Sequence, residues 1–348
     1  MEILTYILVY IFSLFFIFTS KALNKKIGFY FWIFSTTLLS ISLRLKLDPL
    51  SDSDMGNYIR LMSSDIDLLY LNREFMFYGT SRLLYSFCNS EFIVFIFWDL
   101  VIFFSYYFAC VKLCNYFLKN SQENILNFIL FSSILFFPFV LGLHTIYRQL
   151  IAAVIFMNSF ASFLEGKKLK GFIFFFISFF IHNSCFLFLP ILLITYENKF
   201  IKIISIIILI LTSYFIFTVI NSTNELLYRD FQTNVSGPHI TRMYILSLCF
   251  LILLVLVFET FITKFKYISI LVYLLLMSII YISSVIAYSS GMSERVVVFL
   301  YTIFYPIFTT YIYSIFKEKK TIMVVYLHIS LLPIILLHNS TIDLSLTF

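Results

Sequence analysis

The feature of this sequence that most limits its fold is a succession of long apolar runs that contain no charged residue. Residues 203–220 and 244–258, for example, carry only apolar, aromatic, hydroxyl and thiol side chains. A helix of about 20 such residues crosses a bilayer, whereas a membrane-spanning strand has about 10 residues of alternating polarity. These runs are apolar on every face, so we predict membrane-spanning helices.

Composition supports an all-α, polytopic integral membrane protein. Only 12% of the residues are charged and 61% are hydrophobic, whereas soluble domains are about a quarter charged. The 348 residues leave room for eleven or twelve spans in a single polytopic membrane domain, 1–348. The runs between charged residues are 3–20, 27–43, 91–111, 125–141, 149–165, 170–183, 185–197, 203–220, 243–262, 267–286, 296–316 and 321–337.

The lysines predict how these spans cross the membrane. Lys21, Lys25 and Lys26 follow the first run, and every second loop after it is also rich in lysine. Because basic loops stay in the cytoplasm, the amino terminus and the alternate loops should lie outside. The two long outer loops are then 44–90 and 221–242.

One stretch, 170–197, predicts half-helices. Lysines flank both of its ends, so the chain should leave the cytoplasmic side and return. Each arm would be about 20 Å long at about 1.5 Å per residue, shorter than the roughly 30 Å hydrocarbon core. We therefore expect a re-entrant hairpin whose tip, at His182, Asn183 and Ser184, lies in a cavity.

The first long outer loop also contains an amphipathic pattern at 73–87. Phe75, Tyr78, Leu83 and Phe87 fall on roughly one side of a helix. Such a helix is typical of one that lies at the membrane interface on the periplasmic side.

Several function classes are excluded at this stage. The net charge of +6 is spread over short loops, so it forms no nucleic-acid-binding face. The five cysteines lack metal-ligand spacing, and no GxxxxGK[ST], GxGxxG, HExxH or CxxC motif occurs. We therefore predict no cofactor and no metal, and any energy for chemistry must arrive in the substrate.

The two basic residue types are distributed differently. Fifteen of the sixteen lysines fall on the predicted inner side, and all eight arginines fall on the outer side. The positive-inside rule treats both alike, but the planar guanidinium grips phosphate through two hydrogen bonds. The pattern indicates an outer phosphate or pyrophosphate site, with pairing to outer acids as the alternative. The arginines are Arg44, Arg60, Arg73, Arg82, Arg148, Arg229, Arg242 and Arg295.

Of the eight arginines, Arg148 occupies the position where a positive charge should cost the most free energy. It interrupts a nearly uncharged stretch, 125–165, at the outer start of a span, where the helix dipole disfavours a cation. His144 would share its helical face, and Arg295 repeats the pattern at a later span. Ionisable residues at such places point to function, although a snorkelling interface residue is the alternative.

Four other ionisable residues could serve acid–base chemistry on the outer side. His182 lies at the proposed hairpin tip, Asp54 follows the second span, and Glu74 begins the amphipathic helix. A transfer onto a hydroxyl needs a base of this kind, although solvated loop acids are the ordinary alternative. Asp99 lies inside a span and so needs a partner, either an outer arginine or a reacting group.

Five segments resemble one family of membrane proteins. In order along the chain they read SDSDMGNYIRLM, REFMFYGTSRLL, IYRQLIAAVIF, FFIHNSCFLFLP and SERVVVFLY. This order is similar to that of the EpsG-like, Wzy-type polysaccharide polymerases of bacterial envelopes. The positions that match are Asp54, Tyr58, Glu74, Phe77, Tyr78, Arg148, Gln149, His182, Ser184, Pro190 and Arg295.

The resemblance implies a glycosyltransferase of the bacterial inner membrane whose active site faces the periplasm. Such enzymes join undecaprenyl-pyrophosphate-linked oligosaccharides into O-antigen of lipopolysaccharide or a related surface polysaccharide. Arg148 and Arg295 would hold the pyrophosphates, and Glu74, His182 or Asp54 would act on the acceptor hydroxyl. The resemblance leaves room for a chain-length regulator as partner and implies no nucleic acid.

The role of two tyrosines and the choice among three functions stay open. Tyr58 and Tyr78 could stack on sugar rings or anchor the protein at the interface. A lipid-linked oligosaccharide flippase or other transporter would also need arginines, but these should line a path open to both leaflets. An O-antigen ligase uses the same donor and differs in its acceptor.

Overall fold

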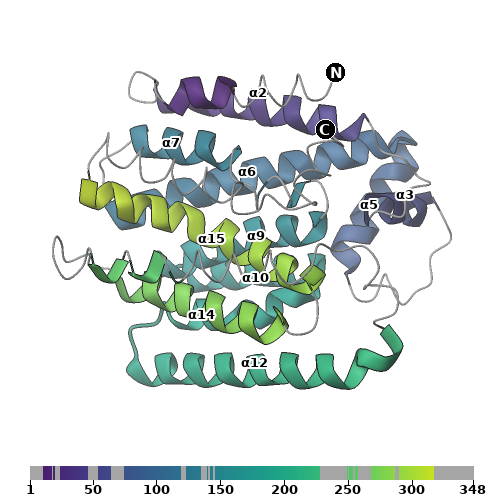
Figure 1. Cartoon of the computed structure of the whole chain (residues 1–348). Coiled ribbons are helices and arrows are strands. Elements are labelled where there is room, and N and C mark those ends of the chain that lie inside the picture. The colour runs from purple at the N-terminus through teal and green to yellow at the C-terminus, as the bar shows by residue number, and fades with distance from the viewer. Residues whose placement is uncertain are drawn as a thin grey trace. The chain divides into compact units, whose positions relative to one another are not determined.

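A computed structural model describes most of the chain (Figure 1). The described residues are 11–17, 19, 24–45, 54–63, 74–118, 123–134, 139, 142–143, 146–227, 249, 251–253, 255–257, 268–286 and 290–316. Within them every regular element is a helix, which confirms the all-α prediction. The chain divides into two compact units, Met1–Phe186 and Leu187–Thr347, and each is considered by itself. The single-domain interpretation stays a prediction.

The first unit contains seven of the described helices. They are α2 (Lys25–Arg44), α3 (Asp54–Ser63), α5 (Phe75–Cys88), α6 (Glu91–Leu118), α7 (Glu123–Ile134), α9 (Tyr147–Leu164) and α10 (Lys168–Ile181). The 3₁₀ segment η2 (Asn183–Phe188) follows α10. The second unit contains α11 (Leu189–Leu193), α12 (Lys199–Leu227), α14 (Ile268–Ile286) and α15 (Ser290–Phe316).

Helix α9 forms the core of the first unit. It packs against α6 and α10, and every one of its residues except Arg148 is buried. Alanine and serine side chains allow the close approach, as is usual for helices packed in a membrane. Ser159 of α9 donates to the carbonyl of Gly171 at 2.7 Å, and Ser178 of α10 donates to that of Ala152 at 2.8 Å. These two bonds join the body of α9 to α10.

The described helices agree with most predicted spans. Among the described residues, four stretches are long and apolar enough to cross a membrane: Lys25–Arg44, Glu91–Leu118, Tyr147–Leu164 and Arg295–Ile315. Helix α12 continues beyond the predicted end at Ile220, because the polar residues that follow include no glycine or proline to stop it. The predicted spans 3–20 and 243–262 lie mostly, and 321–337 wholly, outside the described residues.

The chain breaks its helical path where the half-helices were predicted. Helix α10 ends at Ile181, and His182 adopts an extended conformation with φ −152° and ψ 116°. The 3₁₀ segment η2 and the five-residue helix α11 follow. Pro190 lies in the first turn of α11, where its missing N–H costs nothing.

The described part of the predicted outer loop 44–90 includes the helices α3 and α5, and one detail of the amphipathic prediction is wrong. Phe75, Leu83 and Phe87 are exposed, but Tyr78 is buried. The inner face of α5 also includes Ser81, which accepts a hydrogen bond from the indole of Trp98 in α6 at 2.9 Å. Packing against α6 therefore decides which face of α5 is covered.

Candidate active site

Arg148 is the second residue of α9, and tertiary contacts hold the start of this helix. The N-cap residue, Ile146, offers no side-chain hydrogen bond to the free amides of the first turn. The positive end of the helix dipole disfavours a cation there, so the guanidinium needs partners of its own. Those partners come from helices that precede α9 in the sequence.

Helices α3 and α5 supply the partners of Arg148. Its Nε donates to the hydroxyl of Tyr58 at 2.9 Å, and its Nη1 forms an ion pair with Oε2 of Glu74. The guanidinium carbon also lies 4.9 Å from the ring centre of Tyr58 and 5.3 Å from that of Tyr78. Aromatic faces attract a cation electrostatically, so the two rings add to the ion pair.

The second oxygen of Glu74 faces His182. Nδ1 of His182 lies 3.7 Å from Oε1 of Glu74. The same nitrogen accepts a hydrogen bond from the backbone N–H of Ser184 at 3.2 Å, and it lies 2.8 Å from the Ser184 hydroxyl. A ring nitrogen that accepts carries no proton, so in this arrangement the imidazole proton is on Nε2.

These residues form one site, which we call the Arg148 cluster: Tyr58, Glu74, Tyr78, Arg148 and His182. Their side chains come from α3, α5, α9 and the end of α10. The cluster is only partly covered, with side-chain exposures of 18% for Arg148, 11% for Glu74 and 13% for His182. A ligand can therefore reach the charged groups.

The structure places the other predicted site residues as follows. Gln149 is buried in α9. Asp54 begins α3, but its side chain lies outside the described residues, as does the whole of His144. Arg295 lies near the start of α15 in the second unit and is half-buried.

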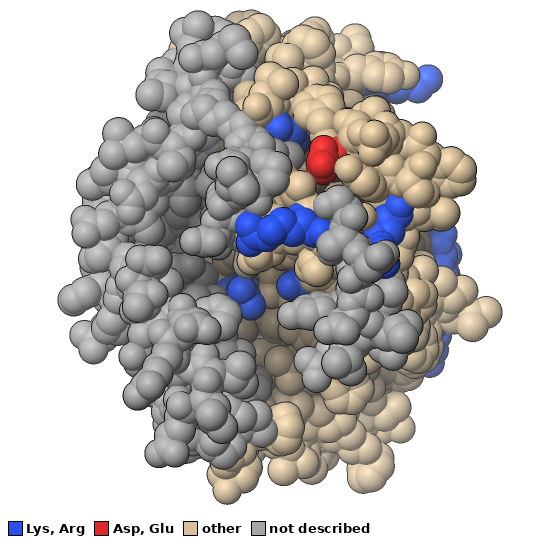
Figure 2. Space-filling view, turned by 90° about the vertical axis from the view of Figure 1, so that its right-hand side faces the viewer, with Lys and Arg blue, Asp and Glu red and all other residues tan. Residues whose placement is uncertain are grey.

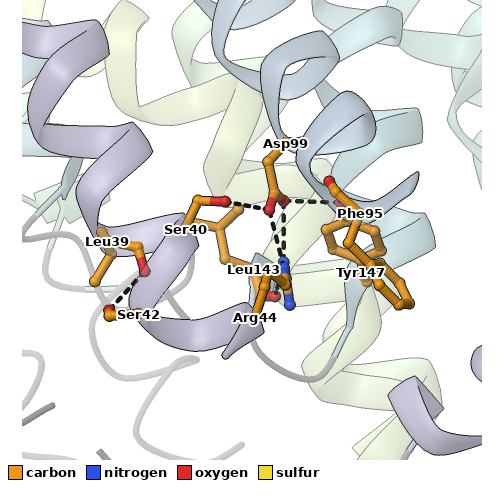
Figure 3. Close-up of polar contacts among 8 residues, drawn as sticks. All are labelled: Leu39, Ser40, Ser42, Arg44, Phe95, Asp99, Leu143 and Tyr147. Atoms are coloured by element: carbon orange, nitrogen blue, oxygen red, sulfur yellow. Dashed lines mark hydrogen bonds and ion pairs between the residues drawn. The ribbon is translucent and has the colours of Figure 1, made fainter. Parts of the chain in front are cut away.

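One arginine of the outer set does not serve a ligand site. Arg44, at the end of α2, is 2% exposed and pairs with Asp99 of α6, which is 1% exposed. Nε of Arg44 lies 2.9 Å from Oδ2 of Asp99, and Nη2 lies 3.0 Å from Oδ1 (Figure 3). Nη2 also donates to the carbonyl of Leu143 at 2.9 Å. For Arg44 the structure shows the alternative, pairing with an acid, because the buried carboxylate of Asp99 accepts from two of its nitrogens.

Two hydroxyl groups complete this buried pair. Tyr147 of α9 donates to Oδ1 of Asp99 at 2.7 Å and also lies 3.0 Å from the carbonyl of Phe95, and Ser40 of α2 donates to Oδ2 of Asp99. We call Ser40, Arg44, Asp99 and Tyr147 the Arg44 cluster. Of the two kinds of partner expected for Asp99, an outer arginine or a reacting group, the structure shows the arginine.

Sequence reasoning missed Tyr147 and Ser40. Tyr147 precedes Arg148 directly, and Ser40 lies one helical turn before Arg44. The only available signal was this proximity to an arginine, because a tyrosine or serine near the end of an apolar run is otherwise common. Within the described residues, no group of three or more His, Cys, Asp or Glu side chains could hold a metal ion.

In the view of Figure 2, several Lys and Arg side chains lie near the middle, with an acidic side chain close to them. Such a surface attracts anionic ligands.

Comparison with known proteins gives one match. The model of a family described as the EpsG family matches residues 29–345. No curated protein matches the chain, and no solved structure does. The match covers every residue of the Arg148 cluster.

Proposed function

The chain belongs to the EpsG family, and from this premise we propose that it polymerises lipid-linked oligosaccharides into O-antigen or a related surface polysaccharide. Family membership and the apolar helices support a polysaccharide-related polymerase of a membrane in general. The observation that carries the finer proposal is the Arg148 cluster. There a partly exposed guanidinium, a carboxylate and an imidazole meet at the start of a spanning helix.

The proposed reaction is a substitution at an anomeric carbon. A hydroxyl oxygen of one oligosaccharide unit attacks the reducing-end anomeric carbon of the growing chain, forming the new glycosidic bond. The bond between that carbon and the pyrophosphate oxygen breaks, and undecaprenyl pyrophosphate leaves with the electron pair. The proton of the attacking hydroxyl goes to a base of the protein.

Arg148 is proposed to bind the pyrophosphate. Negative charge grows on the bridging oxygen as the carbon–oxygen bond breaks, and a positioned guanidinium stabilises that charge. Tyr58 and Glu74 hold the guanidinium from one side, so it need not reorganise when the substrate arrives. Arg295 is proposed to bind the second pyrophosphate, as the sequence resemblance implies.

Glu74 and His182 are the two candidates for the base. The geometry favours Glu74, because Nδ1 of His182 already accepts from the Ser184 amide and Nε2 carries the proton. A neutral imidazole in this form donates a hydrogen bond and suits a sugar or phosphate oxygen. Asp54 stays a third candidate, on the sequence alone.

The remaining assignments are proposals of the same kind. Tyr58 and Tyr78 are buried beside Arg148, so they would support its guanidinium at the substrate site, and Gln149 and His144 would help to bind the substrate. The site would face the periplasm from the bacterial inner membrane, because the arginines fall on the side without lysine-rich loops.

Elongation in detergent tests this proposal. Purified protein in micelles should convert lipid-linked repeat units into longer glycans and release undecaprenyl pyrophosphate. The Arg148→Ala variant should not do so. Lys167→Ala is the matched control, since it also removes a cation from an ion pair, with Glu165, but that pair lies beyond the end of α9 and its lysine is exposed.

The same assay separates the alternatives. Micelles have no leaflets, so a flippase cannot lengthen a glycan there. Wild-type protein that leaves the repeat units unchanged in micelles but moves them across vesicles would be a transporter. Transfer of a finished glycan to a lipid A core, without elongation, would identify a ligase. Either result would contradict the proposal.

A further inference from the structure

The Arg148 cluster and the Arg44 cluster meet at the start of α9. Tyr147 and Arg148 are consecutive, so their side chains leave the helix about 100° apart and enter different surroundings. The hydroxyl of Tyr147 reaches Asp99, and the guanidinium of Arg148 reaches Glu74. Any shift of this helical turn would move both groups together.

The Arg44 cluster holds that turn through contacts with α6 and α2. The hydroxyl of Tyr147 donates to Asp99 and lies 3.0 Å from the Phe95 carbonyl, both in α6. Arg44 of α2 donates to the Leu143 carbonyl, three residues before the N-cap of α9. Its guanidinium carbon also lies 4.6 Å from the ring centre of Tyr147. These contacts supply the anchoring that the N-cap side chain lacks.

One aromatic ring connects the two clusters. Phe77 of α5 is fully buried, and its ring centre lies 6.5 Å from that of Tyr147 and 5.3 Å from that of Tyr58. It also lies 5.4 Å from the ring of Trp98. Buried rings at these distances are close-packed, so a displacement on one side is felt on the other. The position of Tyr58, a partner of Arg148, therefore depends on the same packing.

We infer that Tyr147 is a positioning residue: its hydroxyl, bonded to Asp99 of the Arg44 cluster, fixes the start of α9 so that Arg148 meets Tyr58 and Glu74. The inference rests on the proposed function of Arg148 in binding pyrophosphate. Tyr147 itself touches neither substrate nor reacting atoms, and it acts through the backbone of α9. A residue that no ligand can reach would therefore still affect function.

A pair of matched variants tests this role. Tyr147→Phe and Ser40→Ala each delete one hydroxyl that is bonded to Asp99, but only Tyr147 belongs to α9. The activity is elongation of lipid-linked repeat units in micelles, measured per amount of folded protein. Tyr147→Phe should lower kcat/KM for the donor about tenfold, since even a small misplacement of a positioning group is costly. Ser40→Ala should change it less than twofold.

The outcomes are distinct. An equal loss in both variants, or no loss in Tyr147→Phe, would overturn the inference while elongation by the wild type still supports the proposed function. Failure of the wild-type protein to elongate would instead remove the proposed function itself. If Tyr147→Phe is not recovered folded, Arg44→Lys replaces it, because a single ammonium cannot serve both Asp99 oxygens and Leu143. That variant should show the same tenfold loss, and unchanged kcat/KM would overturn the inference.

Discussion

The two arginine–carboxylate pairs of the first unit contain the same chemical groups but differ in their exposure and in their hydrogen-bond partners. Arg44 and Asp99 are 2% and 1% exposed, whereas Arg148 and Glu74 are 18% and 11% exposed. Asp99 accepts hydrogen bonds from an arginine, a tyrosine and a serine. Glu74 has its arginine on one oxygen and an imidazole 3.7 Å from the other.

The difference shows that two properties decide what such an ion pair can do: how deeply it is buried, and whether protein groups already occupy its hydrogen-bonding positions. The residue types are the same in both pairs. A fully buried pair survives only when its charges have partners inside the protein, and those partners leave no place for a ligand. A partly exposed pair keeps water and substrate within reach. We therefore expect changes in the Arg44 cluster to lower stability first and to affect activity only through the position of Arg148, whereas changes in the Arg148 cluster should affect activity directly.

The largest expected effect is on stability. Asp99→Leu leaves Arg44 as an unpaired buried charge, which should lower the free energy of unfolding by about 3–5 kcal/mol. Glu74→Gln should cost only about 1 kcal/mol, because water reaches that pair. Thermal unfolding of the purified proteins in detergent measures both.

A double variant sharpens this prediction. Combining Arg44→Met with Asp99→Leu removes both charges, so most of the lost stability should return. If the double variant unfolds as easily as Asp99→Leu alone, the uncompensated charge is not the cause.

Exchanging arginine for lysine should act mainly on elongation in the Arg148 cluster and should also lower stability in the Arg44 cluster. Arg148→Lys keeps the charge but loses the planar fork, and we expect elongation to fall about hundredfold or more with little change in unfolding. Arg44→Lys should lower the unfolding temperature and reduce elongation about tenfold. Wild-type elongation by Arg148→Lys would contradict its assignment to the pyrophosphate.

The base can be identified by two substitutions with similar shape. We expect Glu74→Gln to slow elongation about hundredfold, within the range for loss of a general base. His182→Gln should slow it about tenfold, because it removes a hydrogen-bond donor only. Single-turnover rates of both variants give the order, and the reverse order would assign the base to His182.

The smallest effect concerns the ring that supports Arg148. Tyr58→Phe keeps the aromatic face but removes the acceptor for Nε of Arg148, a hydrogen bond to a charged group worth about 1.5 kcal/mol. Elongation should fall about tenfold. Tyr58→Leu, which also removes the ring, should lose more, and an equal loss in the two variants would mean that the ring contributes nothing.

Much of the architecture could be read from the sequence. Uncharged apolar runs have no stable place in water, so the helical, membrane-spanning class followed directly. The break at His182 was also predicted, because lysines at both ends of 170–197 require the chain to return. Helix boundaries and the inner face of α5 were less accurate, because packing against α6 decides them.

The sequence by itself determined that Arg148 occupies a costly position for a membrane protein, and it offered Glu74 and His182 as candidates for chemistry on the same side. Only the tertiary structure decided that these three meet and that Arg44 does not join them. Arg44 and Arg148 have the same side chain and the same predicted side of the membrane. They differ because Arg44 pairs with the buried Asp99, whereas Arg148 lies in a partly exposed cluster. Partners and burial are properties of neighbouring helices, which no local pattern in the chain records.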